Sequence, residues 1–112
     1  MNMASDVRAI LLNMDFSPVD RHIVHQLIRS STSVAANYRA ATRSRSDREF
    51  YAKICIVTEE ADESLFWLEC LILIQVLDGN KIITLSNEID QLVRLFVTIK
   101  RKIAEKLDSK RK

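Results

Sequence analysis

Apolar residues recur every three or four positions along most of the chain, which is the period of an amphipathic α-helix. The pattern predicts four helices, over residues 3–14, 18–43, 47–79 and 87–108, with residues 109–112 expected to fray. The predicted core positions are Met3, Val7, Ile10 and Met14; Ile23, Leu27, Val34, Tyr38 and Ala41; Phe50, Ile54, Val57, Ala61, Leu68 and Leu71; and Ile89, Leu92, Phe96, Ile99, Ile103 and Leu107.

Residues suited to helix ends mark most of these boundaries. Ser17 is the predicted N-cap of the second helix, because its hydroxyl can accept a hydrogen bond from a free backbone N–H. Ser46 and Glu49 form the capping-box pattern at the start of the third helix. Gly79 is expected to end that helix, and Ser86 to cap the fourth after a loop.

The short connections predict an all-α fold, an antiparallel up-down-up-down four-helix bundle with a short first helix. One glycine and one proline in 112 residues leave few places for turns. This length predicts a single domain over residues 1–112. The third helix has a second apolar face, so it is either central in the bundle or in contact with another subunit. That face consists of Leu65, Phe66, Cys70 and Leu73.

A polar layer is predicted between the second and third helices. If their turn is centred near residue 45, Arg29 lies within reach of Glu60 or Glu63, beside a block of small hydroxyl residues that permits close helix packing. The candidate layer comprises Arg29, Ser30, Ser31, Ser33, Asn37, Glu60 and Glu63. Three interpretations stay open: an ion-paired layer that sets helix register, solvated charges, or a binding site.

Four aromatic residues are predicted anchors of the core or of an interface: Tyr38, Phe50, Trp67 and Phe96. If the third and fourth helices pivot near residue 81, Trp67 lies close to Phe96. Large buried aromatic side chains dominate core and interface energetics.

Basic residues gather at one end of the predicted bundle, where the second helix ends, the third begins and the fourth ends. We call this end the basic pole. Its basic residues are Arg39, Arg43, Arg45, Arg48, Lys53, Lys100, Arg101, Lys102, Lys106, Lys110, Arg111 and Lys112. Only Asp47, Glu49, Glu105 and Asp108 oppose them, which leaves about +8 at the pole and about −6 elsewhere. Lysine near helix C-termini is common, but arginines around a turn are typical of phosphate contact.

The sequence contains no recognisable catalytic or cofactor site. A single glycine excludes a Gly-rich phosphate loop and a nucleophile elbow. His22 and His25 share a helix face without a third ligand, so no metal site is expected. Because catalytic and cofactor motifs are missing, neither an enzyme nor a bound cofactor is expected. Cys55 and Cys70, fifteen residues apart on one helix, are too distant to form a disulfide. No signal peptide or membrane span is apparent, which predicts a cytoplasmic protein with reduced thiols.

Three segments together resemble a known family: Gln26 to Ala41, with the pattern Arg-Ser-Ser-x-Ser-Val-x-Ala-Asn-Tyr, then Ser46 to Phe50, then Glu60 to Glu69. They are similar to the bacterial four-helix bundle family of 23S rRNA intervening-sequence proteins, over about residues 18–107. The resemblance implies an antiparallel bundle that assembles as a homopentamer. Some relatives are encoded within segments inserted in ribosomal RNA genes. Similar proteins accompany diversity-generating retroelements as accessory variability proteins and bind nucleic acid.

The predicted first helix departs from that family, in which the first helix is about as long as the others. Here about eleven residues precede the first loop, which is ~16 Å of helix against ~46 Å for the third helix. Either the start codon is misplaced, or a neighbouring subunit covers an apolar strip near Val34 and Tyr38.

Two functions are consistent with these features. The first is a non-enzymatic oligomeric scaffold whose basic pole binds RNA or DNA with little sequence preference. The second is a protein–protein interaction module with no nucleic-acid ligand. The expected partners are further copies of the chain and RNA or DNA, with no membrane and no small-molecule substrate.

Overall fold

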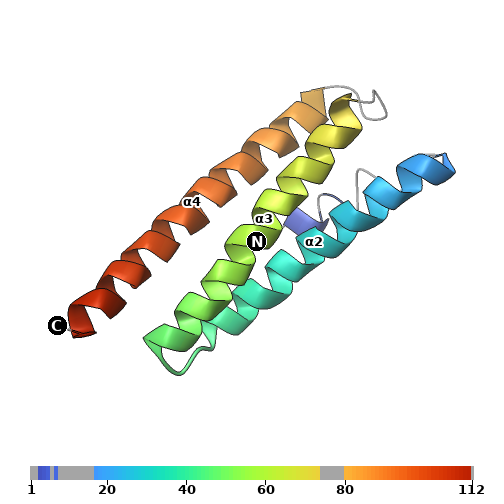
Figure 1. Cartoon of the computed structure of the whole chain (residues 1–112). Coiled ribbons are helices and arrows are strands. Elements are labelled where there is room, and N and C mark those ends of the chain that lie inside the picture. Colours follow the sequence, from blue (N-terminus) through green and yellow to red (C-terminus); the bar gives the residue numbers. More distant parts are fainter. Residues whose placement is uncertain (1–2, 6, 8–16, 74–79, 112) are drawn as a thin grey trace.

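The computed structural model describes residues 3–5, 7, 17–73 and 80–111, which form an all-α bundle (Figure 1). Three long helices are α2 (Pro18–Thr42), α3 (Asp47–Leu73) and α4 (Asn80–Arg111). Residues 3–5 and 7 are also helical, and the described residues contain no strand. The molecule is elongated, with dimensions of 54 × 21 × 20 Å. The all-α bundle prediction is therefore confirmed.

Helix α3 is central in the bundle. It packs against α2 on one side and α4 on the other, and successive helices run antiparallel (Figure 1). Because α3 has two neighbours, it needs apolar residues on more than one face. The buried hydrophobic cluster includes Met3, Val7, Val24, Leu27, Val34, Val57, Ala61, Leu68, Leu71, Leu85, Ile89 and Phe96.

The predicted caps form at the starts of α2 and α3. The Ser17 hydroxyl accepts the Asp20 N–H at 3.2 Å. The Ser46 hydroxyl accepts the Glu49 N–H at 3.1 Å, which is the first bond of a capping box. The return bond differs, because the Glu49 carboxylate accepts the N–H of Arg45 at 3.4 Å, one residue before the cap.

The start of α4 corrects the predicted boundary. The helix begins at Asn80, so Ser86 lies inside it and is not its N-cap. Leu85 is buried and lies one helical turn before the fully buried Ile89, so core packing extends the helix through residues that local cap signals assigned to a loop. The predicted stop at Gly79 lies outside the described residues.

The end of α4 also differs from expectation. Residues 109–111, which were expected to fray, are helical. The Lys110 ammonium donates to the Asp47 carboxylate at 2.7 Å, and Lys106 contacts the same carboxylate at 3.2 Å. These two contacts attach the last turns of α4 to the first turn of α3.

The apolar strip expected near Val34 is absent. Val34 is completely buried within the single chain, in the same cluster as Met3 and Val7. Tyr38 is 37% exposed, and its ring centroid lies 5.8 Å from that of Phe96. The expectation was therefore wrong for Val34, which residues of its own chain bury.

Trp67 and Phe96 lie at different levels of the bundle, contrary to the prediction. Trp67 makes an edge contact with His22, whereas Phe96 contacts Tyr38, and those partners are sixteen residues apart on α2. This separation is about 24 Å along the helix. The early start of α4 explains the error. The chain reverses direction between α3 and α4 at a lower residue number than predicted, so Phe96 pairs with an earlier part of α3. The fourth predicted anchor, Phe50, is half-buried.

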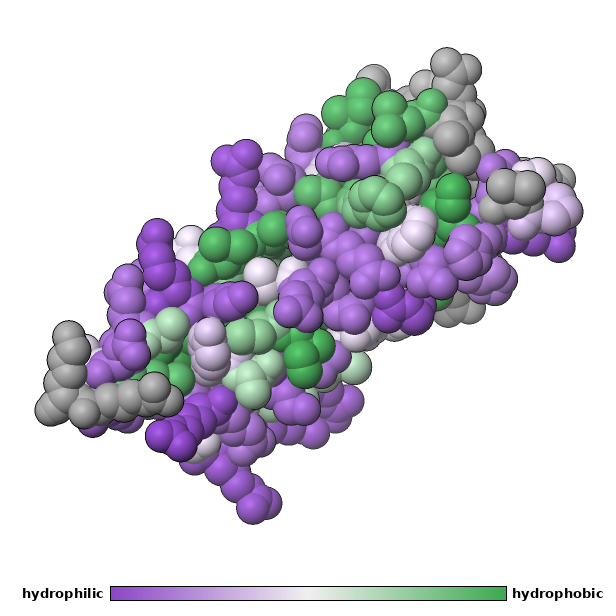
Figure 2. Space-filling model, viewed as in Figure 1, coloured by the Kyte–Doolittle hydropathy of each residue, from purple (hydrophilic) through white to green (hydrophobic). Residues whose placement is uncertain are grey.

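Three exposed apolar side chains lie toward the end of the bundle opposite the basic pole. Phe66 and Leu73 on α3 are 53% and 80% exposed, and Ile83 near the start of α4 is 57% exposed. Figure 2 shows apolar groups at the end where α3 finishes and α4 begins, and others along the bundle. Among the described residues, no helix combines the length and apolar character needed to cross a bilayer.

Candidate functional site

The fold brings the basic pole together at one end of the molecule. The end of α2, the start of α3 and the end of α4 meet there (Figure 1). Arg39 and Arg43 come from the end of α2, Arg45 from the turn, Arg48 and Lys53 from α3, and Lys100, Arg101, Lys102 and Lys106 from α4. Lys53 and Lys100 are half-buried, and the other seven are exposed. Lys112 lies outside the described residues.

Four of these cations share a trough between the end of α2 and the start of α3. The trough has a volume of about 600 Å³. It is lined by Ala36, Arg39, Ala40, Arg43, Arg45, Glu49 and Lys53, so four basic residues face one carboxylate. None of the four basic side chains forms an ion pair with a described residue. Their charges are therefore available to an external anion.

A second hollow at the same pole has balanced charge. It has a volume of about 690 Å³ and lies between the start of α3 and the end of α4. Its lining residues are Ser46, Asp47, Arg48, Tyr51, Ala104, Leu107, Asp108 and Lys110. Two basic and two acidic residues line this hollow, so their formal charges cancel, in contrast to the trough.

Asp47 is the centre of charge neutralisation in that second hollow. Hydrogen bonds from Lys110 and Lys106 lower the pKa of the Asp47 carboxyl below its ordinary value. Both lysines are thus engaged in holding α4 against α3. The sequence analysis placed Lys106 and Lys110 in the basic pole with the arginines, but in the structure both contact the Asp47 carboxylate.

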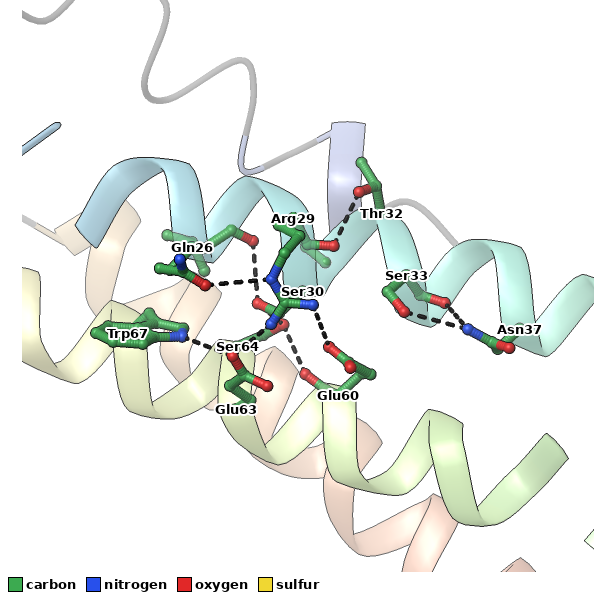
Figure 3. Close-up of polar contacts among 12 residues, drawn as sticks. Gln26, Arg29, Ser30, Thr32, Ser33, Asn37, Glu60, Glu63, Ser64 and Trp67 are labelled. Atoms are coloured by element: carbon green, nitrogen blue, oxygen red, sulfur yellow. Dashed lines mark hydrogen bonds and ion pairs between the residues drawn. The ribbon is translucent and has the colours of Figure 1, made fainter. Parts of the chain in front are cut away.

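The polar layer between α2 and α3 is a compact network (Figure 3). The Arg29 guanidinium donates to Glu60 at 3.3 Å and also to Glu63. Beneath it, the hydroxyls of Ser30 and Ser64 lie 2.8 Å apart and are completely buried. The charged contacts therefore join α2 to α3 at the level where small buried serines let the two helices approach closely.

Three predicted members of the layer do not join the network. The Ser31 hydroxyl donates to the Ile28 carbonyl at 3.1 Å, and the Asn37 amide donates to the Ser33 carbonyl and hydroxyl. These bonds stay within α2. A short polar side chain in a helix can donate to a backbone carbonyl three or four residues earlier instead of to a partner on the facing helix. A prediction based on facing positions does not account for this alternative partner.

Three members of the network were missing from the prediction. Gln26 accepts the Arg29 Nε–H at 3.2 Å, and the Trp67 indole donates to Glu63 at 3.1 Å. Ser64 contacts Ser30 as described above. The spacing of Gln26 and Arg29, and of Glu63 and Trp67, by three or four residues on one helix was a usable signal for both pairs.

Glu63 is expected to titrate below an ordinary glutamate. Hydrogen bonds from Trp67 and then Arg29 lower the pKa of its carboxyl from the ordinary 4.5. Because the pKa of Glu63 is lower in the folded chain, the unfolded chain binds more protons at acidic pH. The stability that Glu63 contributes is therefore present above about pH 4.5 and is lost as pH falls through the lowered pKa. Trp67→Phe keeps a ring but removes the donor, so the Glu63 pKa should rise toward 4.5. Carboxyl-carbon NMR titration measures this shift, and an unchanged pKa would contradict it.

The histidines and cysteines considered in the sequence form no metal-binding group within residues 3–5, 7, 17–73 and 80–111. No group of three His, Cys, Asp or Glu residues is arranged to hold a metal ion. Cys55 and Cys70 are free thiols and are half-buried. His22 contacts the edge of the Trp67 ring, with centroids 6.3 Å apart.

The family of the chain follows from its sequence match. The family described as 23S rRNA-intervening sequence protein matches residues 1–98. The chain belongs to this family. As a 23S rRNA-intervening sequence protein, it matches from its first residue, so the family similarity includes the segment before α2 as well as the segments that carried the resemblance.

A solved structure supports the same fold. A crystal structure of a protein of unknown function from the S23 ribosomal protein family of Bacteroides thetaiotaomicron is similar, with a TM-score of 0.67 and 26% sequence identity. The similarity covers 88% of this chain and 85% of the crystallised chain. No curated protein matches the chain.

Proposed function

We propose that this protein is a non-enzymatic oligomeric scaffold that binds RNA or DNA through its basic pole. The observation that carries this proposal is the trough, where Arg39, Arg43, Arg45 and Lys53 surround a single carboxylate and form no ion pairs with described residues. Clustered arginine and lysine on one face are the electrostatic footprint of nucleic-acid binding.

Backbone contact is the expected mode of binding. No aromatic side chain lines the trough, so unpaired bases would have no stacking surface there. Arginine forks match phosphate oxygens, and contacts to phosphate carry no direct sequence information. The complex should therefore be weak, sensitive to salt and tolerant of sequence.

Removing turn arginines should weaken binding and its salt dependence. We expect the triple variant Arg43→Gln, Arg45→Gln and Arg48→Gln to bind less tightly, with a flatter plot of log affinity against log salt. The slope should fall by about 0.7–0.9 for each phosphate that the variant no longer neutralises. The melting temperature should stay close to that of the parent, because all three side chains are exposed. Fluorescence anisotropy with labelled RNA and DNA measures the slope, and parental binding at every salt concentration would contradict the proposal.

The scaffold is proposed to be a homo-oligomer, with exposed apolar residues near the end of α3 and the start of α4 contributing to contacts between copies. Phe66, Leu73 and Ile83 support this, because large exposed apolar groups mark interaction surfaces. The number five comes from the family resemblance. Light scattering at micromolar chain concentration should give a pentamer mass, and a monomer mass would contradict self-assembly.

The same apolar residues favour a second candidate, a protein–protein interaction module with no nucleic-acid ligand. They lie away from the basic pole, so a protein partner could bind there without contacting the trough. Retention on immobilised RNA at low salt, with release as salt rises, supports the nucleic-acid scaffold. Failure to bind RNA or DNA, together with specific capture of a protein partner, supports the module.

A further inference from the structure

Two hollows open at the basic pole, and they differ in charge. The hollow between α3 and α4 is neutral, whereas the trough between α2 and α3 has four basic residues against one acidic residue. We infer that the trough is a phosphodiester-binding site that takes successive phosphates of one nucleic-acid strand, and that the cations of α4 do not contact the ligand. This inference rests on the proposed function and assigns its binding to one part of the pole.

The trough presents cations from two helices around an open floor. Arg39 lies in the last turn of α2, Arg43 directly follows the helix, and both line the trough. Lys53 faces them from α3. Ala36 and Ala40 line the trough without long side chains that would fill it. Cations on both walls can therefore neutralise consecutive phosphates of a strand lying in the trough.

Glu49 places one negative charge among the cations of the trough, which makes a local site distinguishable from a diffuse basic surface. It is the one carboxylate among the lining residues, and it accepts the Arg45 N–H at 3.4 Å. A phosphate in the trough would be repelled by this charge. Glutamine can accept the same backbone N–H, so Glu49→Gln should keep the turn and strengthen phosphate binding. A gain of affinity on removing the Glu49 carboxylate would show that the phosphate binds close to Glu49, as well as that positive charge favours binding.

The cations of α4 have different surroundings. Lys106 and Lys110 share the Asp47 carboxylate, which neutralises part of their charge. Lys100, Arg101 and Lys102 line neither hollow. Lys100, Arg101 and Lys102 contribute to the long-range field of the pole but do not line the trough.

Matched pairs of variants separate a local site from the field of the whole pole. Lys53→Gln and Lys102→Gln each remove one positive charge, the first in the trough and the second on α4. Glu49→Gln and Glu105→Gln likewise each remove one negative charge, in and outside the trough. Arg43→Gln and Arg101→Gln form a third pair. Binding of the full chain to a fluorescein-labelled single-stranded oligouridylate and to a duplex DNA of random sequence would be measured across a salt series, with melting temperatures as folding controls.

The trough predicts unequal effects within each pair. Lys53→Gln and Arg43→Gln should each reduce the salt slope by about 0.7–0.9, whereas Lys102→Gln and Arg101→Gln should leave it unchanged. Glu49→Gln should tighten binding more than Glu105→Gln. Inorganic tripolyphosphate should compete with the oligonucleotide for the parent, and less well for Arg43→Gln.

Two other results overturn the inference and are distinguishable. Equal changes within all three pairs would show that binding depends on the net charge of the pole, so the trough site would be wrong while the proposed function stands. No binding of either probe by the folded parent at low salt would overturn both.

Discussion

Replacing Phe96 with alanine should lower the free energy of unfolding by about 3–5 kcal/mol. Phe96 is 1% exposed, and its ring lies 5.8 Å from that of Tyr38, so it joins α4 to α2 within the core that also contains α3. Truncation removes apolar contacts and leaves a cavity that the surrounding helices can only partly close. Urea unfolding measures the decrease, at one fixed chain concentration because assembly would make stability depend on concentration.

Leu95 is the matched control for Phe96. It is the preceding residue of α4 and is 52% exposed. Leu95→Ala should therefore change the free energy of unfolding by only about 0.5 kcal/mol, as is usual for surface substitutions. Equal decreases for the two variants would contradict the orientation of α4 relative to the core.

Replacing Ser30 with leucine should also be strongly destabilising. Ser30 is fully buried where α2 meets α3, and its hydroxyl lies 2.8 Å from that of Ser64. There is no room for a larger side chain unless the helices separate, and overpacking of this kind costs about 1–3 kcal/mol. Thermal and urea unfolding measure this effect, which should be accompanied by weakening of the neighbouring Arg29 contacts.

Two further substitutions test whether size is the cause. Ser30→Ala should cost about 1 kcal/mol or less, because the Ser64 hydroxyl still reaches the Glu60 carbonyl at 2.8 Å and stays satisfied. Thr32→Leu places the same large side chain on the exposed side of α2 and should change stability little. If the alanine variant were as unstable as the leucine variant, the hydrogen bond and not the close packing would be decisive.

The polar layer shows which part of a site can be inferred from helix pairing. Antiparallel pairing about the turn places Arg29 opposite Glu60 and Glu63, and the structure has both contacts. Helix pairing does not predict the hydrogen-bond partners of Ser31, Ser33 and Asn37. The Ser31 hydroxyl and the Asn37 amide donate to backbone carbonyls within α2, and the Ser33 hydroxyl accepts from Asn37.

The basic pole shows a second limit of inference from sequence. Helix order is sufficient to bring the basic residues to one end, because successive helices reverse direction. It does not distinguish Lys106 and Lys110, which contact Asp47, from Arg43 and Lys53, which line the trough. That difference depends on how each helix is rotated about its axis, and rotation is set by packing of the whole bundle.

The helical class, the caps of α2 and α3, the family and the separation of charge between the two ends could all be read from the chain alone. These features depend on residues close together in the chain or on helix order. Three-dimensional packing was needed to establish where α4 begins, that Val34 is buried within one chain, and which cations share the trough. Burial by distant residues stabilises these arrangements. Leu85 is buried in the core and keeps α4 helical ahead of Ser86, because the local preference of that serine for a cap is weaker than the free energy of burying the leucine.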